Sequence, residues 1–345
     1  MIKKSGINKI LIIKLKGIGD VVLSTIVLKN LKTDFPEAAI DFLTEPPSVL
    51  VLEGLPQINK ILLFRKKEKL SGLRTILEVM KNRYDLIIDF YSNPRTALIT
   101  LLSLAKYRAG FPYRGRKYAY NLFGPSERGV HHSADLHLEF LKSIQIYAQE
   151  KELLFPLSQE SKKFAVDYFN HTFSPDDFVV AISPSGGWES KKCPPEVFSQ
   201  IAEKLIGKFR AKILIIWGPE DYDEAVKIKD GIAENLISSV FLAPRTTVLQ
   251  SAAIISLCSV MISNDSGPMH IASALKTPIL GLFGPTSPFM HGPYGSANGW
   301  VRHDQLDCIE CNLLTCPINK KCFYDLPILK IIDKFELLIK EIIPK

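Results

Sequence analysis

The segment Ser263–His270 (SNDSGPMH) holds the densest group of residues able to bind a charged ligand. It follows Ser259–Ile262, a short apolar run that predicts a buried strand, and it precedes a helix-compatible run. Asp265, Ser266 and Gly267 therefore stand where a strand ends and a helix begins. Ligands of open α/β sheets bind there, and free N–H groups favour phosphate. Simple helix capping by Asp265 or Ser266 is the alternative explanation.

A second loop of this kind lies near the N-terminus, after the predicted strand Lys9–Leu15. Its two glycines, one of them Gly19, permit a tight turn that presents Asp20 at the start of a predicted helix, Val21–Leu31. The dinucleotide fingerprint fails because Val22 occupies the position of its third glycine, and no P-loop spacing is present. A carboxylate at the end of a strand remains, with helix capping again the alternative.

Two further loops follow predicted strands in the second half of the chain. The loop over 183–195 combines small residues, among them Ser185, with Lys191 and a proline-started helix, a composition suited to binding an anion. A pair of solvated lysines is the alternative there. The loop that begins at Trp217 carries Gly218 and Glu220.

Strand and helix patterns alternate throughout the 345 residues, which predicts parallel α/β sheets, and the length suggests two domains. The buried strands expected from apolar, β-branched runs are Lys9–Leu15, Ala39–Leu43, Lys60–Phe64 and Leu86–Phe90 in the first half, and Phe178–Ile182, Lys212–Ile216, Ser239–Leu242, Ser259–Ile262 and Pro278–Phe283 in the second.

The four loops, in this order over some 280 residues, resemble those of glycosyltransferase family nine, the lipopolysaccharide heptosyltransferases. The resemblance implies a GT-B fold, with two Rossmann-like domains whose parallel sheets face each other across a cleft. We place an acceptor-binding domain at 1–160 and a nucleotide-sugar-binding domain at 161–325. A C-terminal helix at 326–345 is expected to pack back toward the first domain.

The resemblance also implies an inverting transfer of heptose from ADP-heptose to a lipopolysaccharide core acceptor, with no cofactor required. Asp20 matches the family's general base, and Lys191 its phosphate-binding lysine. The other residues expected at the donor are Ser185, Gly218, Glu220, Asp265, Ser266, Gly267 and His270. Transfer of another sugar, or sugar-nucleotide binding without catalysis, remains an alternative. Cys193 is a departure, since the family usually has tryptophan there; Trp188 could fill part of that space.

The net charge of +7 favours an anionic partner. We expect Arg65, Arg95 and Arg116, with Gly19, to bind an anionic glycolipid acceptor. Nucleic acid is not expected, because aromatic and groove-reading signatures are absent. No apolar run reaches the roughly 20 residues that span a bilayer, so we expect a cytoplasmic protein. The family resemblance implies a location peripheral to the inner membrane.

Four cysteines cluster near the C-terminus: Cys308, Cys311, Cys316 and Cys322. Their spacing could supply four thiolates to a structural zinc or iron ion. Reduced thiols are an equally good explanation, and disulfides a weaker one for a cytosolic chain. Nothing in the cluster suggests catalysis.

Overall fold

Residues 2–15, 17–127, 129–295 and 297–342 are described in this computed structural model, and within them the strands form two six-stranded parallel sheets. The chain divides into two compact units, Met1–Pro156 and Leu157–Lys345, each built on one sheet. The expected α/β architecture with two parallel sheets is confirmed.

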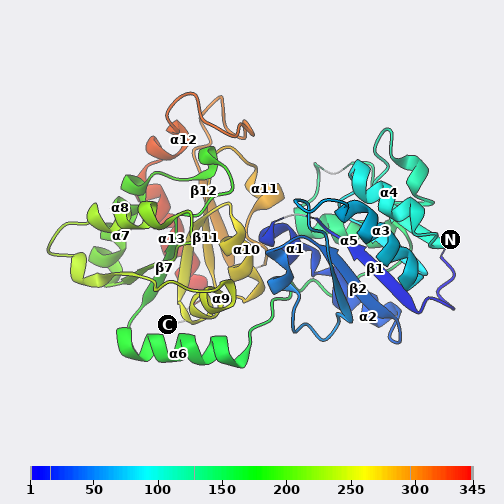
Figure 1. Ribbon diagram of the computed structural model, residues 1–345. Coiled ribbons are helices and arrows are strands. Elements are labelled where there is room, and N and C mark those ends of the chain that lie inside the picture. The colour runs from blue at the N-terminus through cyan, green and yellow to red at the C-terminus, as the bar shows by residue number, and fades with distance from the viewer. Residues whose placement is uncertain (1, 16, 128, 296, 343–345) are drawn as a thin grey trace. The chain divides into compact units, whose positions relative to one another are not determined.

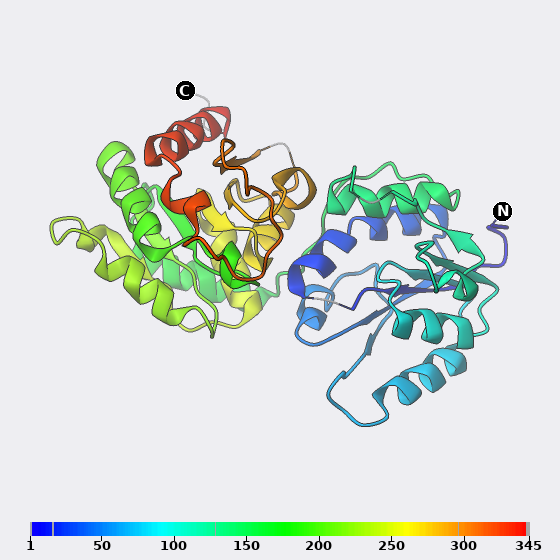
Figure 2. The same ribbon diagram turned by 90° about the horizontal axis from the view of Figure 1, so that it is seen from above.

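The first unit has strand order β3-β2-β1-β4-β5-β6. Its strands are β1 (Lys9–Ile13), β2 (Ala39–Thr44), β3 (Lys60–Leu63), β4 (Leu86–Asp89), β5 (Tyr107–Gly110) and β6 (Leu122–Phe123). Its α-helices are α1 (Ile18–Ser24), α2 (Val27–Asp34), α3 (Ser71–Asn82), α4 (Pro94–Leu102) and α5 (Ser133–Ser143). Helices α3 and α4 cover one face of the sheet, and α1, α2 and α5 the other (Figure 2).

The second unit has strand order β12-β11-β10-β7-β8-β9 (Figure 1). Its strands are β7 (Val179–Ser183), β8 (Lys212–Ile215), β9 (Val240–Leu242), β10 (Val260–Asn264), β11 (Ile279–Phe283) and β12 (Asn298–Arg302). Its α-helices are α6 (Gln159–Thr172), α7 (Pro195–Phe209), α8 (Tyr222–Asp230), α9 (Val248–Leu257), α10 (Gly267–Ala274), α11 (Pro288–His291), α12 (Lys321–Tyr324) and α13 (Ile328–Ile342).

Burial explains why the central strands consist mainly of apolar residues. Strands β4, β7, β10 and β11 are buried along their whole length, because helices cover both faces of a parallel sheet. In the second unit, α7, α8 and α13 pack on one face and α6, α9 and α10 on the other. The edge strands β6 and β12, and β5 next to β6, are less buried and were not expected from the sequence.

One expected helix differs from the structure. The run predicted as one helix, Val21–Leu31, is two, α1 and α2, separated near Thr25. The Thr25 hydroxyl donates to the Val22 carbonyl at 2.7 Å and accepts from the Leu154 amide at 2.8 Å, so it interrupts the helix and fixes the chain there. Helix α13 belongs to the second unit, where it packs on α7, β11 and β12. That the C-terminal helix packs back toward the first domain stays a prediction.

Candidate functional site

The polar residues of the second unit gather at its topological switch point. Strand β7 pairs with β10 on one side and with β8 on the other. After β7 the chain continues to β8, and after β10 it continues to β11, on the other side of the sheet. The loops that follow β7 and β10 therefore meet at the same edge. Ligands of doubly wound sheets bind at this point.

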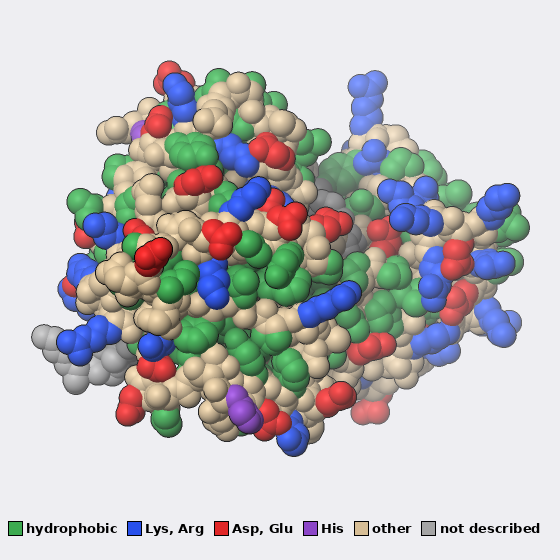
Figure 3. All heavy atoms as spheres, turned by 60° about the vertical axis from the view of Figure 1, so that its left-hand side comes forward, with side chains coloured by type: hydrophobic (Ala, Val, Ile, Leu, Met, Phe, Trp, Pro, Cys, Tyr) green, Lys and Arg blue, Asp and Glu red, His purple; other side chains and the backbone are tan. Residues whose placement is uncertain are grey.

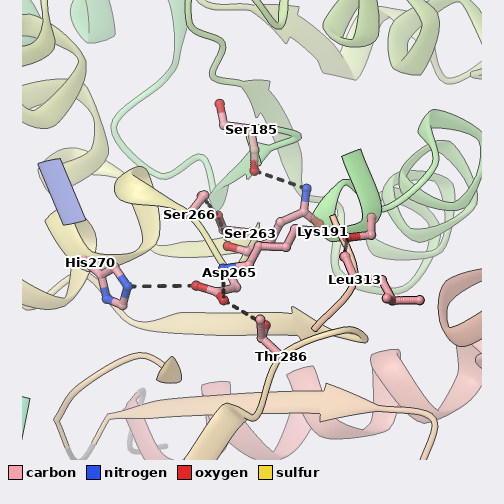
Figure 4. A network of polar contacts seen from close by, with 10 residues as sticks. Ser185, Lys191, Ser263, Asp265, Ser266, His270, Thr286 and Leu313 are labelled. Atoms are coloured by element: carbon pink, nitrogen blue, oxygen red, sulfur yellow. Dashed lines mark hydrogen bonds and ion pairs between the residues drawn. The ribbon is translucent and has the colours of Figure 1, made fainter. Parts of the chain in front are cut away.

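Asp265, directly after β10, is the centre of a buried polar network (Figure 4). Its Oδ2 accepts hydrogen bonds from Lys191 Nζ at 2.6 Å and from Thr286 Oγ1 at 2.8 Å. His270 Nε2 lies 4.0 Å from Asp265 Oδ1. Asp265 is only 6% exposed, so its charge depends on these partners. The Asp265 side chain is thus held by residues of the loops after β7 and β11, with His270 of α10 nearby.

Lys191 lies at the end of a 3₁₀ turn, Glu189–Lys191, and its ammonium is fixed from two sides. Besides the ion pair with Asp265, its Nζ stands 4.3 Å from the centre of the Trp188 ring, a cation–π contact. Trp188 thus helps to fix the position of the Lys191 ammonium.

Cys193 belongs to the hydrophobic core, where burial raises the pKa of its thiol well above the ordinary value.

A second ion pair joins the loops after β7 and β8. Asp221 accepts a hydrogen bond from Ser185 Oγ at 2.6 Å and another from Lys192 Nζ at 2.7 Å. Burial alone would lower the pKa of Lys192, but the hydrogen bond and negative charge of Asp221 raise it above the ordinary 10.5. Glu220, the carboxylate expected here, is exposed, whereas Asp221 is buried.

Asn264, the last residue of β10, links the loops of the switch point. Its side-chain nitrogen donates to the carbonyls of Pro184 at 2.9 Å and Ser185 at 3.3 Å, and its oxygen accepts from the Cys193 amide at 3.2 Å. Asn264 is completely buried. Sequence reasoning missed Asn264, Asp221 and Thr286; their position at the ends of predicted strands was the signal that could have found them.

The capping alternatives can be tested against these contacts. Ser266 is the N-cap residue of α10, yet its side chain makes no capping hydrogen bond. The Asp265 side chain is engaged with Lys191 and Thr286 instead. In the first unit, Gly17 is the N-cap of α1, and Asp20 lies within the first turn. Simple capping therefore does not account for Asp265 or Ser266, whereas Asp20 stands in the first turn of α1, where an acidic side chain also favours the helix dipole.

Asp20 has a less enclosed environment than Asp265. Its Oδ1 lies 3.5 Å from Nζ of Lys14, a lysine whose side chain is almost fully buried, while the Asp20 side chain is 39% exposed. Gly19 precedes it in α1 and is partly exposed. A half-exposed carboxylate supported by a buried cation is a suitable proton acceptor for a ligand arriving from solvent.

The three arginines expected to bind an acceptor have separate surroundings. Arg65 is exposed, with its Nε 3.5 Å from Glu68. Arg95 lies over the Phe64 ring at 5.1 Å. Arg116 donates weakly to the Ser92 carbonyl at 3.4 Å. No residue among those that the structure describes contacts all three arginines.

The cysteine cluster does not form the predicted metal site. Cys308 and Cys311 are exposed, Cys316 and Cys322 half-buried, and all four thiols are free. Within the described residues, no three His, Cys, Asp or Glu side chains are arranged to hold a metal ion. The Cys316 sulfur accepts the Lys320 amide at 3.2 Å, and burial, followed by the neighbouring thiols, raises the pKa of Cys322 to about 12. In the structure the four cysteines are therefore free and not bonded to one another.

The described part of the chain contains no helix with the length and apolar character needed to cross a membrane. Acidic, basic and hydrophobic side chains are interspersed on the face shown in Figure 3.

The sequence matches the family model described as glycosyltransferase family 9 (heptosyltransferase) over residues 73–322. Lipopolysaccharide heptosyltransferase 1 of Campylobacter coli is 24% identical over 298 residues, covering 81% of this chain and 85% of that protein.

Two solved structures have a similar fold. The glycosyl transferase family 9 protein of Veillonella parvula superposes with a TM-score of 0.83 at 22% identity, covering 97% of both chains. The ADP-heptose lps heptosyltransferase II of E. coli gives a TM-score of 0.78 at 18% identity, covering 96% of this chain and 99% of the other. At these identities the likeness concerns the fold, which is that of GT-B heptosyltransferases.

Proposed function

Since the chain belongs to glycosyltransferase family 9, the heptosyltransferases, we propose that it moves a heptose from ADP-heptose to a lipopolysaccharide core acceptor, with inversion at the anomeric carbon. The acceptor is either lipid A carrying Kdo or an inner-core heptose. The observation that carries the proposal is the buried Lys191–Asp265 pair at the switch point of the second sheet, with Thr286 and His270 around it.

The diphosphate of the donor binds beside Lys191 and the first turn of α10. Lys191 supplies a positive charge, and the N–H groups after Ser266 supply the positive end of a helix dipole. Ser266 donates a hydroxyl hydrogen bond to a phosphate oxygen, and Ser185 does the same once its hydroxyl turns away from Asp221. Asp265 and His270 face the junction of sugar and phosphate. Charge building up on the departing diphosphate is stabilised by groups already in place.

The ribose hydroxyls of the donor bind a carboxylate of the loop after β8. Asp221 is better placed than Glu220 for this role, because its hydrogen bonds to Ser185 and Lys192 fix its orientation. Gly218 keeps the approach to that carboxylate open: a β-carbon added there would stand 3.3 Å from an Asp221 oxygen. We infer that the base of the donor nucleotide is adenine, because one of the similar proteins is named for ADP-heptose.

Asp20 acts as the general base. It removes the proton of the acceptor hydroxyl as that oxygen attacks the anomeric carbon and the bond to the diphosphate breaks. The nearby Lys14 ammonium stabilises the ionised carboxylate that this step needs. General-base assistance of this kind contributes about 10²–10⁴-fold to the rate.

The acceptor is anionic, and the basic first unit binds it through Arg65, Arg95, Arg116 and the backbone at Gly19. This places the enzyme at the cytoplasmic surface of the inner membrane. No metal ion takes part in the chemistry, because Lys191 and α10 provide the positive potential at the diphosphate.

Calorimetric titration of the purified protein with ADP, UDP and ADP-heptose tests the donor, and mass spectrometry of a heptose-deficient core acceptor tests the transfer. We expect ADP to bind more tightly than UDP and the acceptor to gain one heptose, with or without EDTA. Tighter binding of UDP would contradict the adenine assignment. Loss of transfer in EDTA, restored by a divalent cation, would contradict metal independence.

A further inference from the structure

Helix α3 presents an apolar stripe to solvent. Leu70, Leu73, Leu77 and Met80 recur at the three- and four-residue spacing that places side chains on one side of a helix, and the three leucines are 68%, 52% and 56% exposed. The opposite side of α3 buries Ser71, Thr75 and Val79. An amphipathic surface helix normally turns its apolar stripe toward the core, so this orientation requires another explanation.

The neighbouring helix α4 repeats the arrangement. It buries Thr96, Ala97 and Ile99 but exposes Leu98 and Leu102, and Leu104 follows it with 78% of its surface exposed. Ile99 of α4 and Val79 of α3 belong to the same buried cluster, so both helices lie on one face of the first sheet (Figures 1 and 2). Their outward leucines therefore belong to one surface.

Two backbone positions strengthen this observation. Leu70 and Leu104 both adopt left-handed conformations, with φ of 62° and 60°. Glycine adopts that conformation at no steric cost and would expose no apolar surface. At both positions the chain instead carries a large apolar side chain directed into solvent.

Basic residues border the leucines. From Arg65 to Arg83 the sequence has seven lysines and arginines and two glutamates. Lys66, Lys67 and Lys69 are exposed in the loop before α3, and none of these three lysines forms an ion pair with any described residue. Arg74 and Lys81 follow the edge of the apolar stripe on the helix itself, as the 100° step per residue requires. The surface is thus both apolar and strongly cationic.

We propose that this surface, called here the α3–α4 face (Leu70, Leu73, Leu77, Met80, Leu98, Leu102 and Leu104 with Lys66, Lys67, Lys69, Arg74 and Lys81), binds an anionic lipid bilayer. The leucines enter the boundary between headgroups and acyl chains, and the lysines and arginines contact the anionic headgroups. The proposal rests on the proposed function to the extent that its acceptor is a membrane lipid. A second copy of the chain is a poorer occupant, because pairing two such faces would oppose like charges.

Co-sedimentation of the full-length protein with vesicles tests this assignment. The vesicles contain phosphatidylcholine alone or with about 30% phosphatidylglycerol. We expect binding to the anionic vesicles, a loss of at least about tenfold in partitioning for Leu73→Gln/Leu77→Gln, and a similar loss for Lys66→Glu/Lys67→Glu. The matched controls are Leu329→Gln/Leu337→Gln, two exposed leucines of α13, and Lys162→Glu/Lys204→Glu, two exposed lysines of the second unit. Both controls should bind like the wild type.

Three results would overturn the assignment: equal binding to neutral vesicles, equal losses in the controls, or light scattering that shows a dimer which Leu73→Gln/Leu77→Gln converts to monomer. Unfolding temperatures establish that the variants are folded. Transfer to a deacylated, soluble acceptor separates the two proposals. The leucine variant should retain that activity if both are right, whereas a wild type that binds vesicles but transfers no heptose would contradict the function alone.

Discussion

The two units present their charged residues in different ways. In the second, Asp265 and Asp221 are buried, each is paired with a lysine, and Asn264 ties their loops together. In the first, Asp20 is half exposed, and Lys66, Lys67 and Lys69 extend into solvent. A buried, paired site suits a small polar ligand that must be held in one orientation. An exposed basic and apolar surface suits a large amphiphilic one.

The largest expected effect is at the half-exposed carboxylate. Asp20→Asn preserves size but cannot accept a proton at neutral pH, so we expect turnover to fall by about 100-fold or more. ADP affinity, measured by calorimetry, should stay within about twofold, because Asp20 belongs to the first unit and Lys191 to the second. Near-wild-type turnover would show that Asp20 is not the general base. The difference in exposure between Asp20 and Asp265 would then have no catalytic meaning.

Lys191→Ala should have the next largest effect. A charge-assisted contact with phosphate is worth about 1.5–3 kcal/mol, so ADP affinity should fall by roughly 10- to 100-fold. The substitution also leaves Asp265 buried without its cation, which costs stability. Lys191→Ala/Asp265→Asn should recover the unfolding temperature but not the ADP affinity. Affinity within twofold of the wild type in Lys191→Ala would place the diphosphate elsewhere.

A matched pair of variants distinguishes the two acidic residues of the loop after β8. Asp221→Asn should weaken ADP binding by about tenfold, as expected for a lost hydrogen bond to a charged group. Glu220→Gln, an exposed neighbour, should leave it unchanged. Calorimetry with ADP and 2′-deoxy-ADP measures both; a larger effect of Glu220→Gln would restore the residue expected from the sequence.

The smallest effect concerns Lys192. Because its pKa is raised in the folded chain, the stabilisation from its pair with Asp221 is fully present below about pH 10.5 and declines as the pH rises through the folded value. The difference in unfolding temperature between wild type and Lys192→Met should be a few degrees at most. It should stay constant from about pH 6 to about pH 9 and shrink above about pH 10.5. A difference that changes with pH near neutrality would contradict this pairing.

The local pattern was sufficient for the central strands and for the loops that follow them. Buried parallel strands require continuous apolar runs, so β1, β4, β7, β10 and β11 were visible in the sequence. The edge strands β6 and β12 were not, because they are less buried and their apolar signal is weak, whereas the edge strands β3 and β9 were expected. The division of Val21–Leu31 into α1 and α2 depends on Leu154, which lies 129 residues from Thr25, beyond the reach of any local pattern.

The sequence by itself determined the α/β class, placed Lys191, Asp265 and Ser266 in loops at strand ends and placed His270 one helical turn after Ser266, since residue type and spacing are local properties. Only the tertiary structure decided which side chains meet. Lys191 and Lys192 are adjacent in sequence, yet they pair with Asp265 and Asp221, which belong to different loops. Strand order sets these partners, because the sheet brings together loops separated by 29 and 74 residues. The same strand order leaves the leucines of α3 facing solvent, which their helical spacing alone would have assigned to the core.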